Sequence, residues 1–192
     1  MRITGGQAAR RRVNVPKGLD VRPTPDRMKQ AVFNSLGERV LNARVLELFA
    51  GSGALSLECL SRGAESALCI EKSRRHAEFI RRNAMTAGLG DLRLLVRVND
   101  VFTAIHQMRA EGRRFDLVLA DPPYGEKNVG RRSASLAQKL LDDPALPELV
   151  EAGGLLVLGH ASRDTLALPE FWRERRVLKH GDNVMRFLVP VV

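Results

Sequence analysis

The sequence predicts an α/β fold in which a mainly parallel sheet carries helices on both faces. Three observations lead to this prediction. Apolar runs alternate with amphipathic segments from residue 44 onward, a glycine-rich turn follows the first run, and acidic residues close the next three. Two further apolar runs near the C-terminus predict an antiparallel hairpin, so we expect a mixed sheet.

Hydrophobic spacing and turn residues place the elements along the chain. Thr24-Pro25-Asp26 has the pattern of a capped helix start, and the helix it opens should end near Gly37. The strands are expected at 44–49, 66–71, 92–98, 115–120 and 154–159. The helices are expected at 53–62, 74–87, 100–110 and 133–142. The edge hairpin should pair 176–179 with 185–189 around a turn at 180–183.

Length and composition indicate a single core. The chain has 192 residues, 44% of them hydrophobic, and we expect a domain at 37–192 behind a basic extension and helix at 1–36. It has no apolar stretch near 18 residues and no signal-peptide pattern, so we expect a cytoplasmic protein without a membrane segment. Cys59 and Cys69 lie in apolar runs, which favours reduced core residues over a disulfide or a metal site.

Positive charge is concentrated at the N-terminal end. Of a formal net charge of +9, residues 1–30 contribute +6, from eight basic and two acidic side chains. Such an arm favours a nucleic-acid partner, because cations that neutralise phosphates release counterions; a solvated tail is the alternative. Candidate RNA-binding residues are Arg10, Arg11, Arg12, Arg22 and Thr24, together with Lys127, Arg131 and Arg132 in a basic loop at 125–135.

A glycine-rich turn, 47–53 (ELFAGSG), follows the first predicted strand. Gly51 and Gly53 would let the backbone approach a ligand closely at the start of the next helix. A nicotinamide dinucleotide site is one alternative, but it requires a third glycine where this chain has Ser56. The other alternative is a tight turn that binds no ligand.

Acidic residues end the second and third predicted strands. Glu71, twenty residues after Gly51, could accept hydrogen bonds from both hydroxyls of a ribose. Asp100 could accept an adenine amino group, or it could only cap the following helix. Because the carboxyl ends of parallel strands meet at one edge, we expect these residues to lie near Asp121, which ends the fourth strand.

Asp121-Pro122-Pro123-Tyr124 is the most informative segment of the chain. The two prolines stiffen the turn and remove two N–H donors, which leaves a carboxylate and a bare carbonyl beside an aromatic ring. Two acceptors and a stacking surface suit a planar group that carries an NH2, such as a nucleobase amine. Packing is the alternative role for Tyr124.

Together these motifs resemble the RsmD family. The resemblance rests on 1–6 (MRITGG), on Arg22-Pro23-Thr24 ahead of 32–34 (VFN), on 47–53 and on 121–124, and it covers residues 1–125 best. It implies a Rossmann-like class I methyltransferase fold that uses S-adenosyl-L-methionine. The implied reaction is methylation of the exocyclic N2 amine of a guanine in bacterial 16S rRNA, within a small ribosomal subunit or an assembly intermediate, by a monomer.

The resemblance also implies residue roles. The turn would hold the methionine part of the cofactor, Glu71 the ribose, and Asp100 with Val101 the adenine. The implied cofactor-binding residues are Glu47, Phe49, Ala50, Gly51, Gly53, Glu71, Asp100, Val101 and Asp121. The implied catalytic residues are Asp121, Pro122 and Tyr124. The resemblance leads us to expect an acid after the fifth strand, but this chain has Gly159-His160 there. We expect His160 to be an ordinary polar residue.

Two other functions stay open at this point. A DNA adenine-N6 methyltransferase shares the Asp-Pro-Pro-Tyr motif, although we expect no separate target-recognition domain in this chain. A catalytically silent RNA-binding ribosome-assembly factor could retain the fold, although the intact motif favours an enzyme.

Overall fold

The structure, a computed structural model, describes residues 1–15, 25–91, 93–124, 127–128 and 131–191. In these residues the helices are α1 (Asp26–Leu36), η1 (Gly37–Val40), α2 (Ala54–Ser61), α3 (Arg74–Ala87), α4 (Val101–Ala110), α5 (Leu136–Asp142) and η2 (Pro147–Leu149). The strands are β1 (Arg44–Leu48), β2 (Ser66–Glu71), β3 (Leu94–Val98), β4 (Phe115–Ala120), β5 (Val150–Ala161), β6 (Trp172–His180) and β7 (Asn183–Pro190).

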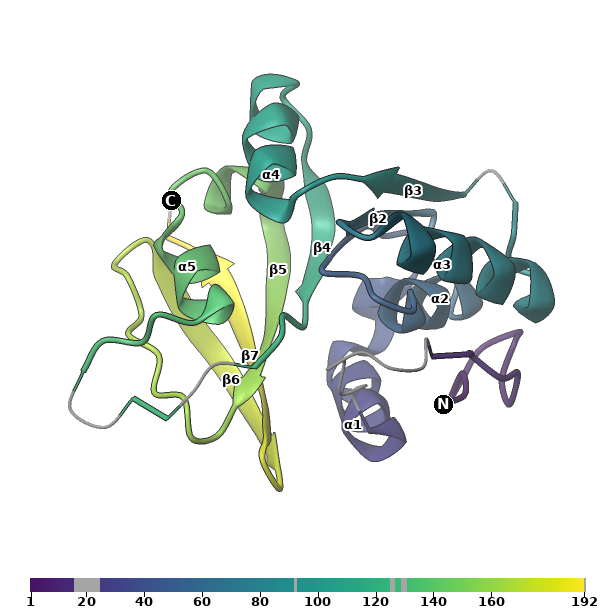
Figure 1. Ribbon diagram of the computed structural model, residues 1–192, viewed down its shortest axis with the longest axis horizontal. Coiled ribbons are helices and arrows are strands. Elements are labelled where there is room, and N and C mark those ends of the chain that lie inside the picture. Colours follow the sequence, from purple (N-terminus) through teal and green to yellow (C-terminus); the bar gives the residue numbers. More distant parts are fainter. Residues whose placement is uncertain (16–24, 92, 125–126, 129–130, 192) are drawn as a thin grey trace.

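The seven strands of the described residues form one sheet in the order β3-β2-β1-β4-β5-β7-β6. Strands β1 to β5 run parallel, and β7 is antiparallel to both β5 and β6 (Figure 1). The strand order reverses between β1 and β4, which is where doubly wound sheets open a crevice at their carboxyl ends. The predicted mixed sheet with a C-terminal hairpin is therefore confirmed.

Helices cover both faces of the sheet, with α1, α2 and α3 on one side and α4 and α5 on the other (Figure 1). Alternate residues of each strand point to opposite faces. In β4, for example, Leu117 and Leu119 join the core under α1 to α3, while Val118 and Ala120 join the core under α4 and α5. Strand β4 therefore contributes to two apolar cores, and β1, β2, β5 and β7 do the same.

Several elements begin at residues other than those predicted: β3 begins at Leu94, α5 at Leu136, β6 at Trp172 and β7 at Asn183. The hairpin turn is shorter than predicted, since His180 and Asn183 pair as strand residues.

Strand β5 and helix α1 also differ from the prediction. Strand β5 starts at Val150, because a bulge opposite Phe115–Leu117 accommodates extra residues, among them Gly153 with φ 78°. Glycine is uncommon inside strands, so Gly153 and Gly154 make the sequence pattern predict a later start for this strand. Helix α1 starts at Asp26 with Pro25 as its N-cap, so the proline precedes the first helical position; Thr24 lies outside the described residues.

The first 15 residues fold against the domain. Ile3 and Val13 are buried in the core beneath α1 to α3. The backbone N–H and the hydroxyl of Thr4 donate hydrogen bonds to Glu58, a fully buried carboxylate of α2. The ammonium of Lys29, also fully buried, lies 3.4 Å from the same carboxylate. These contacts exclude a solvated tail for residues 1–15.

Both cysteines are buried and free. Burial raises the pKa of the Cys59 and Cys69 thiols well above the ordinary value, so both stay protonated, as expected for core residues. Across the part of the chain that the structure describes, no helix is both long and apolar enough to cross a bilayer. The same residues contain no group of three His, Cys, Asp or Glu side chains that could hold a metal ion.

Candidate active site

A cavity of about 580 Å³ opens at the carboxyl ends of β1 to β4. Eight of the residues predicted to bind cofactor or base line it: Phe49, Gly51, Glu71, Asp100, Val101, Asp121, Pro122 and Tyr124. They follow four different strands, and the sheet brings them together at the point where the strand order reverses. The predicted meeting of strand-end residues at one edge is therefore confirmed.

The turn after β1 has an unusual backbone. Phe49, Gly51 and Gly53 all have positive φ values, of 56°, 54° and 73°. For phenylalanine this conformation is strained, and such strain is typical of functional turns. The ring of Phe49 lies edge-on to that of Phe102, with centroids 6.4 Å apart, and both rings line the cavity. The turn therefore presents an apolar wall to a ligand.

Glu71 joins the turn to the start of α3. One carboxylate oxygen accepts the N–H of Gly51 at 2.8 Å, and the other accepts the N–H of Ser73 at 2.8 Å. The imidazole of His76 lies 3.5 Å from the carboxylate. Because a carboxylate offers about four lone-pair sites, acceptor capacity remains for hydroxyls of a ligand in the cavity.

Asp100 caps helix α4 and also lines the cavity. One oxygen accepts the N–H groups of Phe102 and Thr103 at 3.1 and 3.3 Å, which caps α4. The other oxygen lies 3.7 Å from the ammonium of Lys72, and the residue also lines the cavity. Capping fixes the carboxylate in place at the rim.

The segment after β4 is held by the C-terminal hairpin. The hydroxyl of Tyr124 donates a hydrogen bond of 2.6 Å to the side-chain oxygen of Asn183, a buried residue at the start of β7. On β5, Gly159 lies beside the carboxylate of Asp121. The last strands of the sheet therefore position both the ring and the carboxylate.

Three of the residues predicted to bind cofactor lie outside the cavity lining: Glu47, Ala50 and Gly53. Glu47 is 3% exposed, and burial raises the pKa of its carboxyl to about 7. It accepts the N–H of Ser56, in the first turn of α2, at 2.9 Å. A dinucleotide pyrophosphate would need donors at this helix start, so the contact argues against the nicotinamide alternative. Gly53 packs against Ile80, and a Cβ there would lie 2.7 Å from its methyl group.

Sequence reasoning missed five residues that line the cavity: Lys72, His76, Phe102, Leu136 and Arg163. Lys72 and Arg163 follow the ends of β2 and β5, so the same strand-end argument could have identified them. Leu136 lies at the start of α5, and no sequence pattern around it indicates a binding site.

The predicted basic residues lie away from the cavity lining. Arg10, Arg11 and Arg12 are exposed on the folded N-terminal segment, and Lys127, Arg131 and Arg132 are exposed between β4 and α5. Arg22 and Thr24 fall outside the described residues.

His160 has a structural environment, as predicted. It is buried, its Nδ1 lies 2.9 Å from the carbonyl oxygen of Ala161, and its Nε2 accepts a hydrogen bond of 3.2 Å from Arg186. Burial, together with the charge of Arg186, lowers the pKa of the imidazole.

The sheet order and the cavity at its switch point define a Rossmann-like, doubly wound α/β protein with a cavity at the carboxyl ends of its strands, where proteins of this class bind their ligands. The chain belongs to the family described as "Conserved hypothetical protein 95", whose model matches residues 1–189.

Known proteins agree with this assignment. "Ribosomal RNA small subunit methyltransferase D" of Escherichia coli (strain K12) is 38% identical over 124 residues, which are 65% of this chain and 60% of that protein. The match thus spans about 60% of the curated relative. A hypothetical protein of Thermus thermophilus superposes with a TM-score of 0.79 at 32% identity, covering 100% of this chain and 99% of that one. The predicted resemblance to the RsmD family is confirmed.

A third comparison concerns the fold alone. An RNA methyltransferase from Salinibacter ruber, solved in complex with S-adenosyl-L-homocysteine, has a TM-score of 0.64 at 23% identity, covering 88% of this chain and 94% of that one. The predicted Rossmann-like methyltransferase fold is therefore confirmed.

Proposed function

We propose that the protein is an S-adenosylmethionine-dependent methyltransferase that acts on the N2 amine of a guanine in 16S rRNA. The observation that carries the proposal is that Glu71 and the segment Asp121–Tyr124 face one cavity at the switch point of the sheet. Family membership and the name of the Escherichia coli relative support the same activity.

The residues around the cavity fit the cofactor. A volume of about 580 Å³ lies within the range of roughly 300–1,000 Å³ that small-molecule sites occupy. Glu71 and Asp100 offer acceptors for ribose hydroxyls and an adenine amine, while Phe49 and Phe102 offer an apolar wall. When bound, S-adenosylmethionine supplies an electrophilic methyl group.

Asp121 and Pro122 would orient the amine of the base. The lone pair of an exocyclic guanine amine is delocalised into the ring, so the amine is a poor nucleophile. The Asp121 carboxylate and the Pro122 carbonyl each accept one N–H, which directs the lone pair out of the ring plane. The carboxylate also offsets the positive charge that develops on nitrogen. A carboxylate is a weak base toward a neutral amine, so the proton leaves after the new bond has formed.

Tyr124 would hold the base itself. Its hydroxyl is fixed by Asn183, which keeps the ring beside the cavity. A base extruded from its helix, or already unpaired, can stack on this ring, and each such stack contributes about 1–3 kcal/mol. The hairpin therefore prepares the stacking surface before RNA binds.

The RNA partner would be 16S rRNA in a small ribosomal subunit or an assembly intermediate, bound by a monomer in the bacterial cytoplasm. Residues 1–36 would form the RNA-facing extension and residues 37–192 the methyltransferase domain. The exposed arginines at 10–12 support an RNA-facing role for the extension. The name of the Escherichia coli relative supports a small-subunit substrate.

The proposal is tested by tritiated methyl transfer to hypomethylated small subunits, free 16S rRNA and duplex DNA. Asp121→Ala should lower the single-turnover rate by at least about 100-fold and leave cofactor affinity within a few fold. Asp121→Asn keeps one acceptor oxygen but loses the negative charge. Its residual rate therefore separates the contribution of hydrogen bonding to the amine from the contribution of charge stabilisation. The matched control is Glu170→Gln, an exposed carboxylate outside the cavity.

Each alternative has its own outcome in this assay. Transfer to DNA but not to RNA would support the adenine-N6 enzyme. Cofactor binding without transfer to any substrate would support the silent assembly factor. Near-normal transfer by Asp121→Ala would remove the role assigned to the carboxylate.

A further inference from the structure

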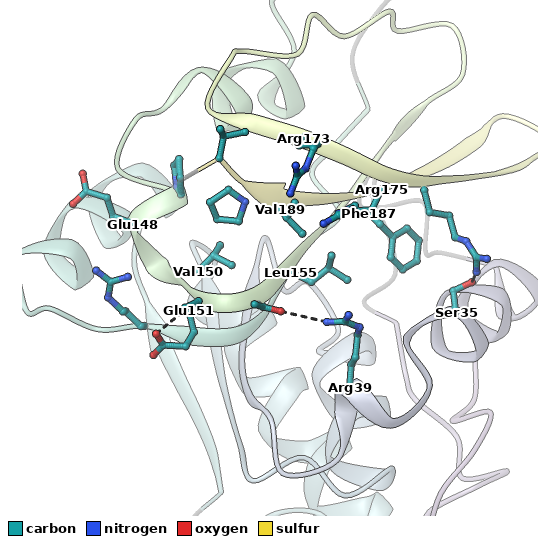
Figure 2. Close-up of a pocket in the computed structure, with 18 residues that line it drawn as sticks. Ser35, Arg39, Glu148, Val150, Glu151, Leu155, Arg173, Arg175, Phe187 and Val189 are labelled. Carbon is teal, nitrogen blue, oxygen red and sulfur yellow. Dashed lines mark hydrogen bonds between the residues drawn. The ribbon is translucent and has the colours of Figure 1, made fainter.

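An open groove of about 1000 Å³ lies at the amino ends of β4 and β5, whereas the cavity lies at the carboxyl ends of β1 to β4. Figure 2 shows the side chains that line this groove. It is built from the start of β5, the start of β6, the end of β7 and the region where α1 meets η1. Five arginines line it: Arg39, Arg114, Arg173, Arg175 and Arg176. We call this surface the arginine groove.

The arginine groove carries positive charge that the described residues leave largely unbalanced. Its two acidic residues, Glu148 and Glu151, pair at 2.9 and 3.1 Å with Arg109 and Arg44, neither of which lines the groove.

Four of the groove arginines, by contrast, contact neutral groups or none. Arg39 donates to the carbonyl of Gly153, and Arg176 donates to the hydroxyl of Ser35. The side chains of Arg173 and Arg175 form no hydrogen bond or ion pair with any described residue.

A β-bulge gathers three of these arginines on one side of β6. In a regular strand Arg173 and Arg175 share a face, and Arg176 points to the other. The register with β7 shifts between Glu174 and Arg176, which makes Arg175 an extra residue and re-aims the strand. All three arginines consequently line the groove.

The remaining walls complete a cationic channel with an apolar floor. Figure 2 shows Arg173 and Arg39 on opposite walls, with Leu155, Phe187 and Val189 between them. The planar, always charged guanidinium group binds phosphate oxygens through paired N–H donors. The chemistry of the groove therefore matches a chain of phosphates.

We propose that the arginine groove binds the phosphate backbone of the RNA substrate, as a second contact remote from the methylated base. The inference rests on the proposed function. Strand β5 connects the two sites, and from Leu155 to Ala161 it extends about 20 Å. A nucleic-acid strand covers such a distance in fewer than about ten nucleotides, so one RNA can occupy both sites. Because phosphate contacts carry no sequence information, the groove sets affinity and orientation.

The test uses the full chain with the double substitution Arg173→Gln/Arg175→Gln. Neither side chain bonds to a described residue, so the fold should be retained, as a thermal melt will show. The matched control is Arg81→Gln/Arg82→Gln on α3, which removes the same charge near the β3 edge of the sheet. Binding of a fluorescent 16S rRNA transcript is measured at several salt concentrations, together with kcat and KM for methyl transfer to that RNA.

The groove variant should bind the transcript at least about 5-fold more weakly than the control. The slope of log K against log salt should flatten by about 1.4–1.8, since each of the two lost phosphate contacts changes it by about 0.7–0.9. KM should rise while kcat at saturating RNA and cofactor affinity stay unchanged. Affinity and slope equal to those of the control would overturn the inference.

Two further outcomes distinguish RNA binding by the groove from protein binding and from methyl transfer itself. Unchanged binding of naked RNA with weakened binding of small subunits would overturn the inference in favour of a protein partner. Failure of the unsubstituted protein to methylate any RNA would instead contradict the proposed function, and the binding data would still decide the role of the groove.

Discussion

Gly159 of β5 lies directly against the carboxylate of Asp121. A Cβ built on Gly159 would fall 2.3 Å from Oδ1 of Asp121 and 3.2 Å from the terminal methyl group of Met185. No larger residue fits there unless the carboxylate moves. The absence of a side chain at Gly159 therefore leaves the space that the Asp121 carboxylate occupies in this chain.

Gly159→Ala should displace the Asp121 carboxylate and lower the single-turnover methyl transfer rate by about 10–100-fold, because small misplacements of a positioned group are costly. Affinity for S-adenosylhomocysteine should change by no more than a few fold. Gly112→Ala serves as a control for backbone strain alone, since its φ of 64° disfavours alanine although nothing lies within 4 Å of a Cβ there. An unaltered rate in Gly159→Ala would show that the carboxylate does not need this space.

Glu71→Ala should weaken binding of S-adenosylhomocysteine by about 1.5–3 kcal/mol, the range for hydrogen bonds to a charged group. The same change removes acceptors from the N–H groups of Gly51 and Ser73, so the melting temperature should also fall. Calorimetry with the thioether and with NAD measures both affinities. Binding of NAD in place of the thioether would contradict the methyltransferase assignment.

Glu47 makes stability depend on pH. Its folded pKa of about 7 lies above the ordinary 4.5, so between these values the folded state binds more protons than the unfolded state. The contribution of this group to stability is therefore complete below about pH 4.5 and is lost as pH rises through 7. Glu47→Gln stays neutral and should gain roughly 1–3 kcal/mol over the parent between about pH 5 and pH 8. Urea unfolding of both proteins at the two pH values measures this difference, and a constant difference would contradict it.

The exposed arginines at 10–12 should contribute to RNA affinity through salt-sensitive phosphate contacts. Replacing all three by glutamine should flatten the salt dependence of binding by about 2 and leave the free energy of unfolding within about 0.5 kcal/mol. Deleting the segment is a poorer test, because it removes Ile3 and Val13 from the core at a cost of about 1.5–3 kcal/mol each. An unchanged slope in the triple variant would show that these arginines do not contact RNA.

The sequence by itself determined the alternation of strands and helices and the residues at the strand ends. Hydrophobic periodicity, glycines at turns and the stiff Asp121–Tyr124 segment are local properties, and they can be recognised without knowing which strands are neighbours. The sequence alone therefore predicts that Glu71, Asp100 and Asp121 share one edge of the sheet.

Only the tertiary structure decided which residues complete the site. Strand order and register place Asn183 against Tyr124 and Gly159 against Asp121, although each pair is far apart in the chain. The same packing buries Glu47 outside the cavity lining. The bulge in β6 directs the side chains of three arginines toward the same groove. Such contacts depend on how distant segments pack, which periodicity along the chain does not encode.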